Sequence, residues 1–260
     1  MDSWLYGDEN AFGYSQEPTN YDRSQAQAPI MWAHGEFDSP TASLLAQTIS
    51  DRMNDRGQLA ASFFFSKHTT PSTFESSTIP GRASIIPTIA YQLAQTITEM
   101  QGPIARAIMQ DISIFHLSLE TQIRKLIVEP LEEASMEVVE EYSHQQSHGA
   151  TAAFSPIPKV IVIQGLDKCE DESFEVAFLR ALCDAMSLPS VCYNVVIPLR
   201  LLVVGRCKDG HKKWIDSLPV HRAPIVLKRP VEDPFPLRNG LIYTLRVGGF
   251  IIGMAPLVLI

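Results

Sequence analysis

Residues 160–164 read Val-Ile-Val-Ile-Gln, and this short run constrains the fold more than any other part of the sequence. Four β-branched apolar residues in succession, bounded by Pro158 and Gly165, are typical of a strand that is buried on both faces. Such strands belong to parallel sheets that helices cover on both sides. Acidic residues follow the run, beginning with Asp167. Phosphate-binding α/β proteins place their magnesium chemistry at this end of a buried strand.

The rest of the chain alternates between strand-like and helix-like patterns. Apolar runs predict further strands at residues 29–34, 59–65, 199–204 and 224–227. Helical spacing of apolar residues predicts helices over residues 41–56, 84–97, 103–111, 119–128 and 173–186. This alternation favours parallel βαβ units, with helices on both faces of one sheet.

Three segments lack such patterns. Residues 1–28 are polar and without a sustained period, which predicts a disordered N-terminal segment. Residues 134–158 are acidic and then rich in His, Gln and Ser, which predicts a flexible insertion. Residues 251–260 form an apolar tail, and the whole apolar stretch 247–260 is shorter than the ~20 residues of a membrane-spanning helix. The folded domain is therefore expected over residues 29–250.

Composition excludes several classes of function. The net charge of −8 argues against nonspecific binding to nucleic acid or to an anionic membrane. The four cysteines lack metal-ligand spacing, and the N-terminus does not read as a signal peptide, so a reduced, cytoplasmic protein is expected. The sequence has neither the GxSxG motif of serine hydrolases nor the GxGxxG motif of dinucleotide-binding proteins.

Five segments carry a resemblance to a known family. They occur in the order LAASFFFSK, PTIAYQLAQ, SIFHLSLETQIRKLIVEPL, VIVIQGLDKCED and LRLLVVGR. Together they resemble the NACHT-type P-loop domain of fungal proteins, a group known as nephrocystin-like N-terminal domains. This group belongs to the signal-transducing ATPases with numerous domains (the STAND class). The resemblance covers residues 29–250, apart from the segment at 134–158.

The resemblance implies a fold and an activity. The fold is a P-loop NTPase-type three-layer α/β sandwich, whose five-stranded parallel sheet has the order 5-1-4-3-2 and helices on both faces. The activity is binding of ATP or GTP with slow hydrolysis, used as a switch for oligomerisation. The chain has about 28 residues before its first expected strand and ends soon after the fifth, so the family's effector domain, helical lid and sensor repeats are expected to be absent.

The phosphate-binding loop of the family, GxxxxGK[ST], is altered here. Its glycines let backbone N–H groups cradle phosphates, its lysine neutralises phosphate oxygens, and its hydroxyl binds magnesium. The corresponding stretch is residues 35–43, which is one residue longer. The resemblance matches Gly35 with the first glycine and Ser43 with the magnesium-binding hydroxyl. Thr41 then takes the place of the second glycine and Ala42 that of the lysine.

The same loop also has a purely structural interpretation. Glu36 and Asp38 would place negative charge beside a phosphate, and Pro40 lacks an N–H group. In an ordinary connection between a strand and a helix, Asp38, Ser39 or Thr41 would cap the helix. Both interpretations remain open at the level of the sequence.

The second family motif is altered as well. Gln164 replaces the Asp that supports magnesium, and Asp167 matches the next acidic position. Lys168 replaces the Glu that orients the attacking water, which inverts the charge there. Arg206 matches the arginine that senses the γ-phosphate. Asp167 could instead serve only to order the loop, or it could pair with Lys168 or Arg206.

Three hypotheses follow from these replacements. In the first, the chain is a pseudo-NTPase that acts through protein partners or self-association, with no firm cofactor and at most weak binding of ATP or GTP with Mg²⁺. In the second, it is a weak nucleotide switch in which the Lys168 ammonium moves toward phosphate and replaces the missing lysine. For this, the ammonium has to converge with the amides of residues 35–43. In the third, the chain is a non-functional fragment of a larger STAND protein.

Overall fold

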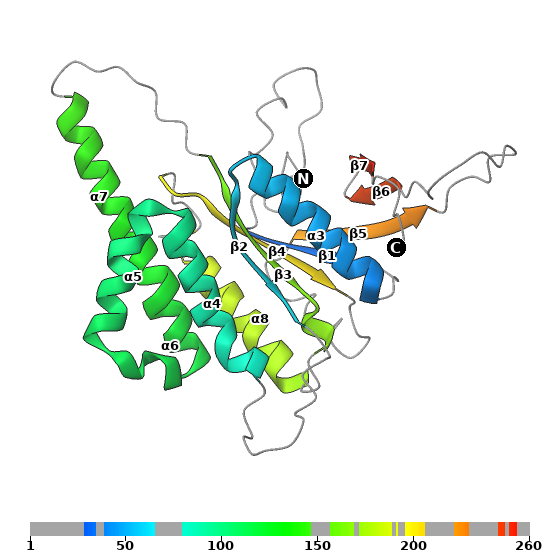
Figure 1. The fold of residues 1–260 in the computed structure, drawn as a ribbon, viewed down its shortest axis with the longest axis horizontal. Coiled ribbons are helices and arrows are strands. Elements are labelled where there is room, and N and C mark those ends of the chain that lie inside the picture. Colours follow the sequence, from blue (N-terminus) through cyan, green and yellow to red (C-terminus); the bar gives the residue numbers. More distant parts are fainter. Residues whose placement is uncertain are drawn as a thin grey trace, which may run out of the picture.

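The computed structural model describes residues 29–34, 39–65, 80–146, 157–168, 172–188, 191, 196–205, 221–228, 244–247 and 250–253. Within them, one sheet has the strand order β2-β3-β4-β1-β5-β6-β7 (Figure 1). Neighbours from β2 to β5 are parallel, whereas β6 and β7 pair antiparallel. The strands are β1 (Ile30–His34), β2 (Leu59–Phe64), β3 (Lys159–Gln164), β4 (Leu199–Gly205), β5 (His221–Lys228), β6 (Thr244–Val247) and β7 (Phe250–Gly253).

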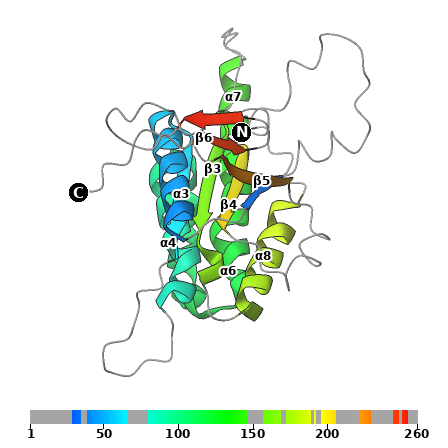
Figure 2. The same ribbon diagram turned by 90° about the vertical axis from the view of Figure 1, so that its right-hand side faces the viewer.

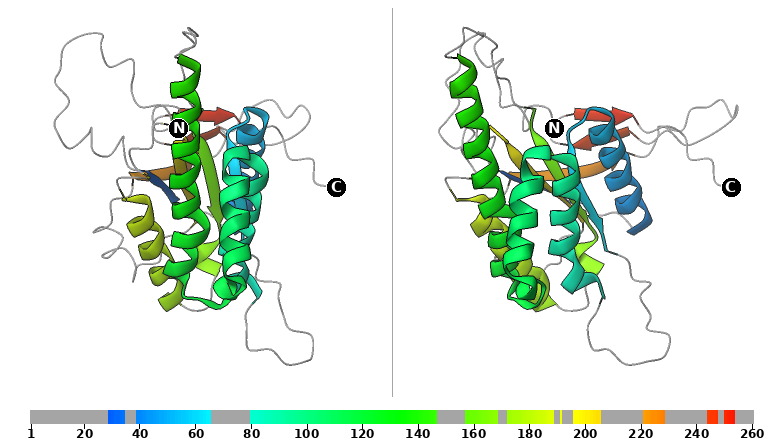
Figure 3. Two further views of the ribbon diagram at one scale, coloured as in Figure 1. Left: turned by 90° about the vertical axis from the view of Figure 1, so that its left-hand side faces the viewer. Right: turned by 60° about the vertical axis from the view of Figure 1, so that its left-hand side comes forward.

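Helices lie on both faces of this sheet. The α-helices are α3 (Ser39–Asp55), α4 (Pro80–Thr96), α5 (Thr98–Gln110), α6 (Leu119–Ile123), α7 (Glu129–Gln146) and α8 (Glu172–Met186). Shorter turns are the 3₁₀-helices η1 (Ile112–His116) and η3 (Leu166–Lys168) and the π-helix η2 (Arg124–Val128). Helix α3 covers one face, and α4 to α8 cover the other (Figure 3, right). The predicted α/β class, a parallel sheet between helices, is confirmed.

The residues of β3 explain this three-layer arrangement. Val160 and Val162 are buried against α3, whereas Ile161 and Ile163 are buried in the larger cluster formed with α4 to α8. Successive side chains of a strand point to opposite faces, so a strand with apolar residues at every position needs a cover on each side. The interpretation of residues 160–164 as a strand buried on both faces is confirmed.

The sheet is wider than the five strands expected from the resemblance, because β6 and β7 extend it beyond β5 (Figure 2). Residues 251–253 were assigned to an apolar tail, but they lie in β7 and pair with residues 244–246 of β6. The predicted disordered segment at 1–28 and the end of the tail, 254–260, lie outside the described residues.

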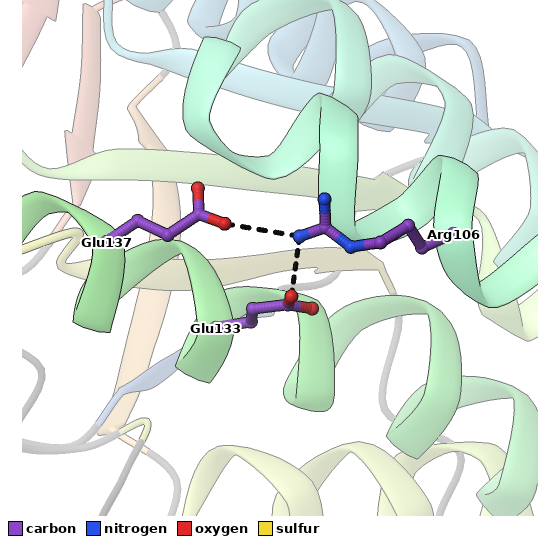
Figure 4. A network of polar contacts seen from close by, with 3 residues as sticks. All are labelled: Arg106, Glu133 and Glu137. Carbon is purple, nitrogen blue, oxygen red and sulfur yellow. Dashed lines mark hydrogen bonds and ion pairs between the residues drawn. The ribbon is translucent and has the colours of Figure 1, made fainter.

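The acidic helix α7 occupies part of the segment that was predicted to be a flexible insertion. Residues 134–146 continue this helix without a break, and residues 147–156 lie outside the described part. Leu131 and Ala134 are fully buried and hold the first half of α7 on the core. Arg106 of α5 binds the carboxylates of Glu133 and Glu137, one helical turn apart on α7 (Figure 4). Acidic residues that suggest a solvated segment are therefore used here to pair with a neighbouring helix.

Helix α4 protects the free edge of the sheet. At the outer side of β2, the Gln92 side chain accepts a hydrogen bond from the Ser62 N–H over 2.8 Å and donates one to the Ser62 carbonyl over 3.0 Å. The Thr96 hydroxyl donates to the carbonyl of Ala60 over 2.7 Å. These side chains satisfy backbone groups that would otherwise be open to pairing with another chain.

We expect Gln92→Ala to lower the free energy of unfolding by about 1–2 kcal/mol, because it removes both partners of the half-buried Ser62 backbone. The matched control is Gln95→Ala on the same helix. The Gln95 amide donates a hydrogen bond to the hydroxyl of the exposed Tyr91, so this substitution should change the free energy of unfolding by less than about 0.5 kcal/mol. Urea unfolding of both variants measures the difference. Equal midpoints would contradict a role for Gln92 at the sheet edge.

No helix in the described part of the chain combines the length and the apolar character needed to cross a membrane.

Candidate functional site

The candidate site lies where the carboxyl ends of the central strands meet the start of α3. In the sheet register, His34 of β1 lies beside Gly205 of β4, and Gln164 of β3 lies beside Val204. The three central strands therefore end at the same edge. Helix α3 begins at Ser39, shortly after β1, and packs against β2, β3 and β4. In parallel α/β sheets, this edge is the usual place for a ligand.

The first turn of α3 carries three of the predicted site residues. Ala42, at the position that the resemblance assigns to the phosphate-binding lysine, is 4% exposed and packs among apolar residues of α3 and the sheet. Thr41 and Ser43 on either side of it are half-buried. Position 42 therefore contributes packing and no charge. Gly35, the predicted first glycine of the loop, lies outside the described residues.

Gln164 is the last residue of β3 and is 1% exposed. Its carbonyl oxygen Oε1 accepts a hydrogen bond of 3.4 Å from the Lys168 ammonium. Its amide nitrogen Nε2 has no hydrogen-bond partner among the residues that the structure describes. A buried N–H group without a partner destabilises a fold, so such groups are rare in native structures.

A sharp turn after β3 brings Lys168 back over the sheet edge. Gly165 has a φ of +80°, a conformation that side chains with a Cβ atom rarely adopt. The 3₁₀ turn η3 follows, closed by a hydrogen bond of 2.9 Å from the Lys168 N–H to the Gly165 carbonyl. As a result, Lys168 Nζ lies 3.3 Å from Ser43 Oγ and 3.4 Å from Gln164 Oε1. The ammonium thus joins the end of β3 to the first turn of α3.

Asp167 takes a different direction. It is half-buried, and its Oδ1 atom lies 3.2 Å from the point where a Cβ would stand on Gly205. The carboxylate is therefore placed against the end of β4, where a glycine gives it room. Arg206, which was predicted either to sense phosphate or to pair with Asp167, lies outside the described residues.

The structure thus brings together Ser43, Gln164 and Lys168 in one cluster of hydrogen bonds. From the sequence, Lys168 inverts the charge of the position that it occupies. In the second hypothesis, its ammonium moves toward the first turn of α3. Its ammonium does lie beside that turn. Whether the amides of residues 35–38 converge on the same point falls outside the described residues.

Helix α8 carries two further buried groups that can ionise, Cys183 and Glu175. Burial raises the pKa of the Cys183 thiol to about 12, so this cysteine of α8 is an inert core residue at neutral pH. Glu175, also on α8, is 1% exposed. The sequence did not single it out, because one acidic residue on an amphipathic helix is normally solvated; its burial is visible only in the fold.

Comparison with known families agrees with this geometry. The sequence matches the family described as Nephrocystin 3, N-terminal, over residues 14–206, which is more than half of the chain. The chain belongs to the nephrocystin 3 N-terminal family. The matched region of this nephrocystin-type domain runs through β4 and includes Ser43, Gln164 and Lys168. No curated protein and no solved structure matches the chain.

Proposed function

We propose that this nephrocystin-type domain is a degenerate NACHT-like nucleotide-binding module of the STAND class. As a pseudo-NTPase in cytoplasmic signal transduction, it acts through contacts with protein partners or with further copies of itself. The observation that supports this most is the position of the Lys168 ammonium between Ser43 Oγ and Gln164 Oε1. In P-loop NTPases, a Ser or Thr and an Asp at these two positions hold magnesium.

The remaining changes point the same way. Hydrolysis needs a group that orients water or accepts its proton, and an ammonium is a donor only. Ala42 supplies no positive charge for phosphate oxygens, and the Gln164 amide is neutral. A domain with these residues can keep the shape of an NTPase without its turnover, and contacts are then its means of passing on a signal.

The exposed apolar side chains support a role in protein contacts. Met109 at the end of α5 is 86% exposed, Ile112 in η1 is 79% exposed, and Met136 on α7 is 61% exposed. Helices α5 and α7 pack on each other, and η1 follows α5 directly. A contiguous apolar patch on a surface often marks a binding site for another protein, and we propose that these side chains contribute to one.

We expect the purified chain to release no phosphate from ATP or GTP with Mg²⁺ beyond the rate of a protein-free control. Ala42→Lys should be equally inactive, since Gln164 and Lys168 still replace the two acidic residues. A phosphate-release assay on both proteins measures this, and a thermal melt shows whether the buried site at 42 tolerates lysine. Measurable turnover by either folded protein would contradict the proposal.

One observation favours a second candidate, a weak ATP- or GTP-binding switch with slow hydrolysis. The Lys168 ammonium lies at the N-terminal turn of α3, where the phosphate-binding lysine of an intact loop would act. In this candidate Lys168 replaces the lysine that Ala42 lacks. The same phosphate-release assay separates the two functions, because only the switch turns over.

A further inference from the structure

The two side chains that receive the Lys168 ammonium stand at the two magnesium-holding positions of a P-loop site. Ser43 offers its hydroxyl oxygen at 3.3 Å and Gln164 its amide oxygen at 3.4 Å. We infer that this ammonium takes the place of the magnesium ion, so that the site receives a polyphosphate as a metal-free anion. The inference rests on the proposed function and goes further, since it names a ligand class and a cation.

The residues present do not fit a magnesium ion. Magnesium in such sites requires oxygen ligands at about 2.0–2.1 Å and is usually bound through at least one carboxylate together with the phosphates. Here the amide of Gln164 brings no charge, and the ammonium already stands between the two oxygens. A divalent ion at this point would meet a positive charge a few ångströms away, and the repulsion would be strong in a partly buried place.

An anion, in contrast, would meet several donors at this edge. The first turn of α3 directs the positive end of a helix of 17 residues toward it. The Lys168 hydrogen bonds, at 3.3 and 3.4 Å, are longer than the usual range and reach neutral oxygens, whereas a phosphate oxygen would accept a charge-assisted hydrogen bond.

The second, independent indication is the buried amide of Gln164. Its Nε2 atom is a donor that finds no acceptor within the described residues, although the side chain is only 1% exposed. The same amide group bonds the Lys168 ammonium through its oxygen, so the unused donor belongs to the same cluster. A phosphate oxygen would supply the acceptor that this group lacks.

Titration calorimetry of the full chain tests the inference with ATP, GTP and inorganic tripolyphosphate, each in EDTA and in excess Mg²⁺. We expect binding in EDTA and an affinity about tenfold lower in Mg²⁺, because the metal neutralises the phosphates and repels the ammonium. Tripolyphosphate that binds as well as ATP would identify the phosphate chain as the whole ligand, whereas tighter binding of ATP or GTP would identify a nucleotide.

Lys168→Met keeps most of the length of the side chain and removes its charge. It should weaken binding in EDTA by about tenfold or more, the loss expected for a charge-assisted hydrogen bond. The matched control is Lys125→Met in η2, an element that packs on α4, α5, α6 and α7; it changes the net charge equally and should leave the affinity unchanged.

Three results would overturn the inference: binding that requires Mg²⁺, no binding in EDTA at millimolar polyphosphate, or equal affinity of the natural protein and Lys168→Met. None of them contradicts the proposed function, which fails only if the protein hydrolyses nucleotide.

Discussion

The double variant Gln164→Asp/Lys168→Glu is expected to bind ATP about tenfold more tightly with Mg²⁺ than without it. The natural sequence should show the opposite preference, so the two substitutions together change the effect of magnesium by about two orders of magnitude. The reason is that they remove the ammonium beside Ser43 and restore carboxylates at the two positions of the motif that lack them here. Calorimetry in EDTA and in Mg²⁺ gives both affinities.

The single variant Gln164→Asp is the control for this experiment. With Lys168 still present, the new carboxylate has an ammonium within reach and should form an ion pair with it. Magnesium should then bring no gain in ATP affinity. In the double variant the buried carboxylate at 164 lacks this partner, so Mg²⁺ should also raise the melting temperature. If the single variant gains as much from Mg²⁺ as the double variant, the ammonium does not exclude the metal.

Gly165→Ala should lower the free energy of unfolding by roughly 2–4 kcal/mol, as the sum of backbone strain and crowding. Gly165 has a φ of +80°, and a Cβ there would lie 3.0 Å from the backbone oxygen of Phe65 and 3.0 Å from Cδ of Lys168. The methyl group would press on the stem that carries the ammonium toward Ser43. Chemical denaturation measures the loss of stability.

Gly57→Ala is the matched control. Gly57 has a similar φ of +66°, but a Cβ there meets nothing within 4 Å among the described atoms. Its substitution should cost only the strain of the left-handed conformation, about 1–2 kcal/mol. A loss at Gly165 no greater than that at Gly57 would show that the turn after β3 is not tightly packed.

Much of the fold could be predicted from local patterns. The β-branched run at 160–164 needs a cover on both faces, and the structure supplies α3 on one side and α4 to α8 on the other. Helix α7 was harder to predict, because the elements that pack on it, such as α5, are distant in sequence. Arg106 pairs with Glu133 and Glu137. From the sequence alone, these acidic residues indicate a solvent-exposed segment.

The candidate site was only partly predictable for a similar reason. The replacements at positions 42, 164 and 168 are visible in the sequence, and they predict weakened phosphate and metal chemistry. The sequence left open whether Lys168 would pair with Asp167 or move toward α3. That direction depends on the positive φ of Gly165 and on the short η3 turn, which place the ammonium beside Ser43.

The most direct test of the central claim is a crystal structure of the chain grown with ATP and excess Mg²⁺. The account predicts that the Lys168 ammonium stays within hydrogen-bond reach of the Ser43 hydroxyl and that no metal lies between Ser43 and Gln164. An octahedral ion bound to Ser43 Oγ, with the Lys168 side chain turned away, would contradict it.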